Sequence, residues 1–120
     1  MKESKKKQSL VPKVAFASYW SDGLEEEWLY FKLMSKDAVR SIVRAMMSMR
    51  MITHYRLDFH REIFRNGYEP NKWRLWILER DEALVALQDM KKIIVEMASA
   101  HGYELHWIPV NRLLNLKLKN

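Results

Sequence analysis

The 120-residue sequence indicates an α+β domain in which two helices cover one face of an antiparallel sheet. Five segments have the alternation or the β-branched and aromatic content of strands, and two have the three- and four-residue apolar spacing of helices. They follow one another in the order β-β-α-β-β-α-β. Without its first strand this order is the split βαβ arrangement of ferredoxin-like domains, so we expect a ferredoxin-like sheet with an extra N-terminal strand.

The first two strands are expected to form a hairpin. Residues 14–20 (VAFASYW) are aromatic, β-branched or small, and Ser21-Asp22-Gly23 provides the turn. Residues 27–35 then alternate. One side of this strand carries Leu29, Phe31 and Leu33, and the other carries Trp28, Tyr30, Lys32 and Met34.

The first helix is predicted to begin at Ser35 or Lys36-Asp37, where a capping side chain and a first-turn acid suit the helix dipole. Its apolar stripe consists of Val39, Ile42, Val43, Met46 and Met49 or Arg50. The pattern changes at Ile52 and Thr53, so we expect the helix to end near Met51.

Two further strands are expected at residues 53–64 and 72–80, on either side of a turn at Asn66-Gly67 and Pro70. On the first, one face carries Tyr55, Leu57, Phe59 and Ile63, and the other carries His54, Arg56, Asp58, His60 and Glu62. On the second, we assign Trp73, Leu75 and Ile77 to the helix-covered side, and Arg74, Trp76 and Leu78 to the opposite side.

The second helix is predicted from Glu82 to about Ala100, after an Asp81 cap and before His101-Gly102, a typical helix end. Its inner stripe is Leu84, Leu87, the stem of Lys91, Ile94 and Met97 or Ala98. Residues 104–110 form the last strand, with Pro109 marking an edge or an end. Leu114, Leu116 and Leu118 then alternate with polar residues, which is typical of a β-arm or of a fraying tail.

The formal charge of +6 is concentrated at the two ends of the chain. Residues 1–13 hold five basic groups against Glu3, and residues 111–120 hold three basic groups and no acid, whereas residues 14–110 carry a net charge of −1. We therefore divide the chain into a basic disordered leader (1–13), a single α+β domain (14–110) and a basic C-terminal arm (111–120). The leader is a solvated tail or an electrostatic arm for phosphates or an acidic surface.

The side of the sheet away from the two helices, called here the open face, is the candidate binding surface. Aromatic rings alternate with cations on it, which suits either single-stranded nucleic acid or a protein interface. A third alternative is that the first strand or the C-terminal arm covers some of these rings as core. The expected binding residues are Trp28, Tyr30, Lys32, Arg56, His60, Arg74, Trp76 and Arg80, with Lys5, Lys6 and Lys7 from the leader.

Three of the four histidines raise the question of a metal site or of acid–base catalysis. His54, Asp58 and His60 share one strand face, and His106 joins them if the last strand lies near. Residues i and i+6 of a strand are about 20 Å apart, however, so His54 and His60 do not reach one ion in a straight strand. We interpret these residues as surface polar groups and keep a metal-dependent hydrolase or nuclease as a minor alternative.

The sequence therefore predicts a small non-enzymatic protein of the adaptor or inhibitor type. It contains no cysteine, no glycine-rich phosphate loop, no HExxH and no GxSxG, and it needs no cofactor. We rank a protein partner or a homodimer first, because residues 14–110 are not basic. RNA or single-stranded DNA is the alternative, although the third strand lacks the glycine-containing string of an RNA-recognition motif. No segment is apolar enough to span a membrane, and we expect a cytoplasmic location.

Overall fold

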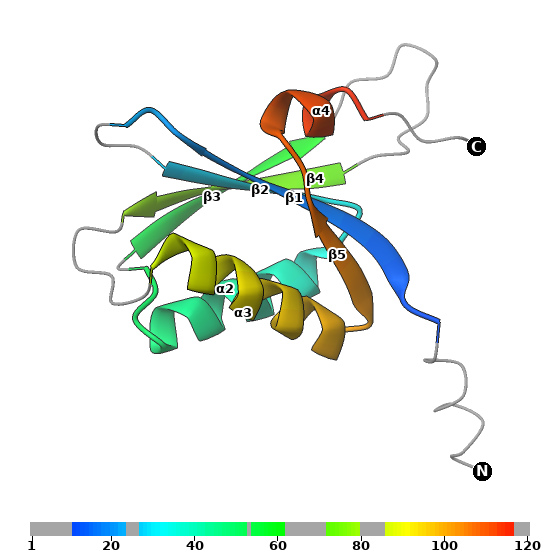
Figure 1. Ribbon diagram of the computed structural model, residues 1–120, viewed down its shortest axis with the longest axis horizontal. Coiled ribbons are helices and arrows are strands. Elements are labelled where there is room, and N and C mark those ends of the chain that lie inside the picture. The colour runs from blue at the N-terminus through cyan, green and yellow to red at the C-terminus, as the bar shows by residue number, and fades with distance from the viewer. Residues whose placement is uncertain (1–10, 24–26, 53, 62–71, 80–85, 117–120) are drawn as a thin grey trace.

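The computed structural model describes residues 11–23, 27–52, 54–61, 72–79 and 86–116 (Figure 1). The elements are β1 (Lys13–Ser21), β2 (Glu27–Lys32), α2 (Lys36–Ser48), β3 (His54–Arg61), β4 (Lys72–Glu79), α3 (Leu87–Ala100), β5 (Tyr103–Trp107) and α4 (Val110–Leu114). For β3 and β4, the course of the backbone and the pairing of the strands are described. The α+β class is confirmed, and the arrangement is compatible with a ferredoxin-like fold.

One five-stranded sheet has the order β3-β4-β2-β1-β5. Three neighbouring pairs are antiparallel, and β1 and β5 are parallel. Phe16 of β1 therefore lies opposite Lys32 of β2 on one side and His106 of β5 on the other. Strand β2 ends earlier than predicted, because Leu33 has a left-handed φ of 70° that does not continue a strand. This order places β3 and β5 at the two edges.

Helices α2 and α3 cover the same face of the sheet (Figure 1). Alternate residues of β1 and β2 are fully buried against them, namely Ala15, Ala17, Leu29 and Phe31. The predicted α2 stripe is confirmed at Val39, Ile42, Val43 and Met46, which are all buried, whereas Met49 is 46% exposed. The hydroxyl of Ser35 accepts a hydrogen bond from the Ala38 amide at 3.1 Å, so Ser35 is the N-cap.

Helix α3 begins at Leu87, after Ala86 at the N-cap position. The predicted start at Glu82, the Asp81 cap and the stripe residue Leu84 lie outside the described residues. Met90, Ile94 and Ala98 form the buried stripe, so two of its positions agree with the prediction. Gly102 follows the helix with a φ of 87°, the left-handed conformation that glycine adopts most readily.

The end of the described chain differs from the prediction. Residues 110–114, which include the start of the expected C-terminal arm, form the short helix α4, so a β-arm is wrong here. Strand β5 ends at Trp107, and Pro109, with a φ of −62°, is the N-cap of α4. Helix α4 lies on the opposite side of the sheet from α2 and α3 (Figure 1). Its Leu113 is fully buried there.

Among the described residues, none of the helices is both long and apolar enough to cross a membrane. The expected cytoplasmic location remains a prediction.

Candidate functional site

The open face is formed by every second residue of the strands. Because Ala15, Ala17, Leu29 and Phe31 face the helices, the residues between them face the other way. The described side chains on the open face are Val14, Phe16, Ser18, Trp20, Trp28, Tyr30, Lys32, Glu104 and His106.

An aromatic patch, defined as Trp20, Trp28 and Tyr30, occupies one part of this face. Trp20 lies directly opposite Trp28 in the β1–β2 pair, and Tyr30 is opposite Ser18. The Trp20 residue is 39% exposed, and Trp28 and Tyr30 are half-buried. Burial raises the pKa of the Tyr30 hydroxyl above its ordinary value. Thus Trp28 and Tyr30 are where the sequence predicted, neither sealed inside nor fully exposed.

Lys32 has a different environment from the one expected. It is fully buried, and its ammonium group donates hydrogen bonds to the carbonyl oxygens of Leu113 at 3.2 Å and Leu116 at 2.9 Å. A cation there complements the partial negative charge at the end of α4. The expectation of an exposed Lys32 is therefore wrong, because α4 covers this part of the face.

Two hydrogen bonds fix the chain just before α4. The Ser18 hydroxyl donates to the carbonyl of Ile108 at 2.6 Å, and the Ile108 amide donates to the carbonyl of Ala17 at 2.9 Å. The start of α4 is thus attached to β1, and its end is attached to Lys32 of β2. The third alternative from the sequence was that the first strand or the C-terminal arm covers some of the rings as core; in the described part of the chain, α4 covers Lys32, and Trp20 stays accessible.

The register of β4 corrects the predicted sides of that strand. Residue Trp76 lies opposite Leu29, and Arg74 lies opposite Phe31. Directly opposite residues share a face, so positions 74 and 76 belong to the helix-covered face, and Trp73, Leu75 and Ile77 belong to the open face. Both faces of this strand carry large apolar residues, so its alternation alone did not determine the orientation.

Strand β3 has the orientation expected from the sequence. Arg56 pairs with Ile77, which pairs with Trp28, so all three positions are on the open face. His60 pairs with Trp73 and shares that face. The binding roles of Arg56 and His60 remain predictions. The other predicted residues, Lys5, Lys6, Lys7 and Arg80, lie outside the described residues.

The metal hypothesis loses one candidate ligand. His106 is on β5, at the opposite edge of the sheet from His54, Asp58 and His60 on β3. Four strand spacings of about 4.8 Å separate the two edges, so His106 does not join that set. The part of the chain with described side chains contains no group of three potential metal ligands. The Nε2 atom of His106 instead lies 2.9 Å from the Glu104 carboxylate.

A cluster of polar and aromatic groups lies on the helix-covered side. The Lys91 ammonium group is 5.8 Å from the ring centre of Tyr19 and 5.3 Å from that of Trp107. Tyr19 donates a hydrogen bond to the Glu27 carboxylate at 2.6 Å, and the Trp107 indole donates to the Lys91 carbonyl at 3.3 Å. These contacts join β1, β2, α3 and β5, and they confirm that the Lys91 stem packs inward.

The open-face residues of β1, among them Phe16 and Trp20, were not predicted from the sequence. The signal was available, because small Ala15 and Ala17 alternate with Phe16 and Ser18. Small residues on one side allow a helix to approach closely, which leaves the larger ones on the other side. The ring of Phe16 lies 6.0 Å from the imidazole of His106, at an interplanar angle of 37°.

Comparison with protein-family models finds no match, and comparison with curated proteins finds none either. Among solved structures, the chain is similar to CutA1 from Pyrococcus horikoshii, with 19% identity over 61% of this chain and 68% of that chain. The TM-score is 0.36. A similarity this low indicates nothing about function.

Proposed function

We propose that this chain is a small non-enzymatic binding protein that engages a protein partner through the aromatic patch on its open face. Trp and Tyr are the residues that most often supply binding energy at protein interfaces, because each buries a large apolar area with few rotatable bonds. The patch is rigidly supported, since Trp20 and Trp28 are held opposite each other by the β1–β2 pairing.

The observation that carries this proposal is the contrast between Lys32 and Trp20. The ammonium group that would neutralise a phosphate is fully buried against carbonyl oxygens, whereas the indole of Trp20 is accessible. Binding of single-stranded nucleic acid needs cations alongside stacking rings. Burial of Lys32 therefore favours a protein partner with an apolar or aromatic contact surface over a nucleic acid.

Affinity purification with quantification of co-purified proteins tests the proposal. The wild-type chain is expected to recover a partner at near-equal stoichiometry, and Trp20→Ala and Trp28→Ala are expected to release it while keeping the wild-type circular dichroism. Arg40→Ala, an exposed residue of α2 on the other side of the sheet, is the matched control and should retain the partner. A partner that stays bound to both tryptophan variants would contradict the proposal.

Single-stranded nucleic acid is the alternative. It is favoured by the position of Arg56 in β3, which lies on the same face as Trp28 of β2 with β4 between them, and by the basic ends of the chain. It predicts that a fluorescent oligonucleotide binds at 50 mM salt, that affinity falls several-fold at moderate salt, and that Trp28→Ala weakens binding. Lack of binding at 50 mM salt would exclude this alternative.

We also infer that the sheet is a ferredoxin-like sheet widened by β1. Without β1, the remaining strands have the order β3-β4-β2-β5, and α2 and α3 each follow a central strand and cover the same face. Nuclear Overhauser contacts test this inference. Backbone protons near Phe16 should contact those near both Lys32 and His106, and direct contact between β2 and β5 would contradict it.

A further inference from the structure

Strand β5 is an edge strand whose outer side faces none of the described strands. The Gly102 carbonyl accepts from the Lys13 amide at 3.0 Å, and the Ile108 amide donates to the Ala17 carbonyl at 2.9 Å. Backbone groups of successive strand residues point to opposite edges, so even-numbered residues of this segment point toward β1. The amide and carbonyl groups of Tyr103, Leu105 and Trp107 therefore point outward.

Among the described residues, β5 has few of the features that protect an edge strand from pairing. Proteins commonly shield an edge strand with proline, lysine or a bulge, and the β5 sequence YELHW contains no proline or lysine. Its five residues pair in continuous register with Lys13–Ala17. The outward groups thus form a regular row of backbone donors and acceptors along the edge.

The sequence of β5 is complementary to itself. If a second copy pairs antiparallel about a two-fold axis at Leu105, Glu104 of each copy lies opposite His106 of the other, and Tyr103 lies opposite Trp107. An axis at position 104 would place two glutamates opposite each other, and an axis at 106 would place two histidines opposite each other. Only the axis at Leu105 pairs carboxylate with imidazole twice, and it also aligns the outward-pointing backbone groups as hydrogen-bonded pairs.

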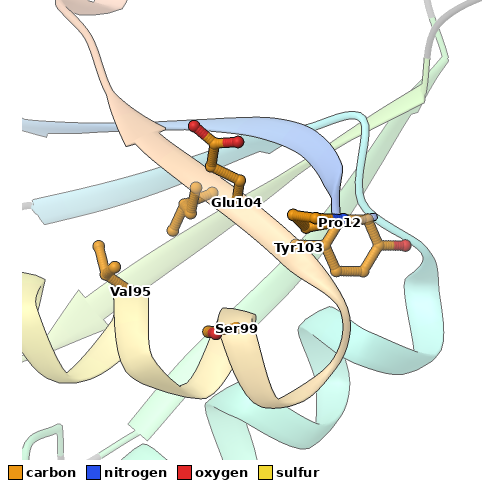
Figure 2. Close-up of a pocket in the computed structure, with 6 residues that line it drawn as sticks. Pro12, Val95, Ser99, Tyr103 and Glu104 are labelled. Atoms are coloured by element: carbon orange, nitrogen blue, oxygen red, sulfur yellow. The ribbon is translucent and has the colours of Figure 1, made fainter. Parts of the chain in front are cut away.

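The side chains that would meet are accessible. The Glu104 and His106 side chains are 53% and 47% exposed, although they contact each other within one chain. Between β5 and α3 lies an open groove of about 290 Å³, lined by Pro12, Val95, Ser99, Tyr103, Glu104 and Leu105. Figure 2 shows Val95 and Ser99 on the helix and Glu104 on the side of β5 away from it. In the proposed register, Trp107 of the second copy lies opposite Tyr103, beside this groove.

We propose that a second copy of this chain pairs with β5, antiparallel about Leu105, to form a two-fold dimer with a continuous ten-stranded sheet. Such an interface is isologous, so the same edge serves both copies and no edge of this kind remains for further growth. This interface is separate from the aromatic patch, and the dimer would present two patches.

Cysteine cross-linking tests both the dimer and its register, because the chain has no cysteine of its own. In an antiparallel pair, positions 104 and 106 of different copies would form a non-hydrogen-bonded pair with Cα atoms about 4.5 Å apart, which a disulfide can bridge. Chains carrying Glu104→Cys are mixed with tagged chains carrying His106→Cys and oxidised with glutathione disulfide. Both residues are exposed, so neither substitution disturbs the core.

We expect a disulfide-linked dimer in the mixture and little or none with either variant alone. The wild-type chain should have a solution mass of twice 14.5 kDa. Ser48→Cys, exposed at the end of α2, is the control for random collision and should not link to Glu104→Cys. Linkage of either variant with itself in preference to the mixture would overturn the register, and a monomeric mass or a dimer without linkage would overturn the proposed interface.

Discussion

The two faces of the sheet are closed in different ways. On one face, α2 and α3 cover Ala15, Ala17, Leu29 and Phe31 with a continuous layer of aliphatic side chains and methionines. On the other face, the described cover is the short α4, held by Ser18 at its start and by Lys32 at its end. The first face is stabilised by close packing over a wide apolar area, and the second by the burial of Leu113 and a few hydrogen bonds.

This difference separates stability from accessibility. A core that excludes water stabilises the fold but offers no surface, whereas a face with a small cover keeps aromatic rings within reach of a partner. If this comparison is correct, substitutions on the helix-covered face will mainly lower the free energy of unfolding, and substitutions of the exposed rings on the open face will mainly weaken partner binding.

Phe31→Ala is expected to have the largest effect, because Phe31 is fully buried in the helix-covered core. Truncation of a buried phenylalanine costs about 3–5 kcal/mol, from lost apolar burial and from the cavity that remains. Urea denaturation measures this loss as a lower midpoint. A decrease below about 1 kcal/mol would mean that the helix-covered face is no more tightly packed than the open face.

Lys32→Met should have the next largest effect and should act locally. Methionine keeps the apolar stem but removes the donor to the Leu113 and Leu116 carbonyls, and leaving such acceptors unpaired costs about 1–3 kcal/mol. Hydrogen exchange should show that the Leu113 amide, which bonds to Pro109, loses protection before the α2 amides. Lys92→Met, an exposed lysine of α3, is the control. Equal loss of protection in α2 would contradict the local role of Lys32.

Trp20→Ala should change stability by only about 1 kcal/mol, since the side chain retains contact with water in the folded state. Its main effect is expected on partner binding, as described above. Urea denaturation measures the change in the free energy of unfolding. A loss as large as that of Phe31→Ala would show that Trp20 belongs to a core and not to an accessible patch.

The smallest effect is expected in alkaline solution, from Tyr30. Its pKa is raised by burial, so the unfolded chain loses this proton at a lower pH than the folded chain does. The contribution of the protonated Tyr30 hydroxyl to the unfolding free energy is complete below about pH 10, and it is lost as the pH rises through the raised pKa of the folded state. Unfolding free energies between pH 8 and pH 11 should therefore decline less steeply for Tyr30→Phe than for the wild type. Identical slopes would contradict the prediction.

Periodicity was sufficient to predict the fold class and the α2 stripe, because one apolar stripe on a polar background permits only one orientation. It did not predict α4. The Leu114 and Leu116 alternation resembles a strand, and the helix depends on Leu113 packing against the sheet and on Lys32 capping its end. Both contacts join residues far apart in the sequence, which local patterns do not report.

The site was predicted only in part for a related reason. Trp28 and Tyr30 lie on a strand whose opposite side is clearly apolar, so their face was assigned correctly. Strand β4 has large apolar residues on both sides. Arg74 and Trp76 were assigned to the open face, but their positions belong to the helix-covered face. Only pairing with β2 determines that orientation, and pairing is a tertiary property.

The first described strand, β1, pairs in parallel with the last one, β5, and Lys13 lies opposite Tyr103. One edge of β1 can therefore pair only after β5 has been synthesised. During synthesis, β1 can form its hairpin with β2 early, but its other edge stays unpaired until β5 has left the ribosome. Long-range pairing of this kind is slow and leaves strand edges exposed to aggregation in the meantime. Nascent chains stalled before Tyr103 should therefore remain protease-sensitive, and resistance should appear only after Trp107 has emerged.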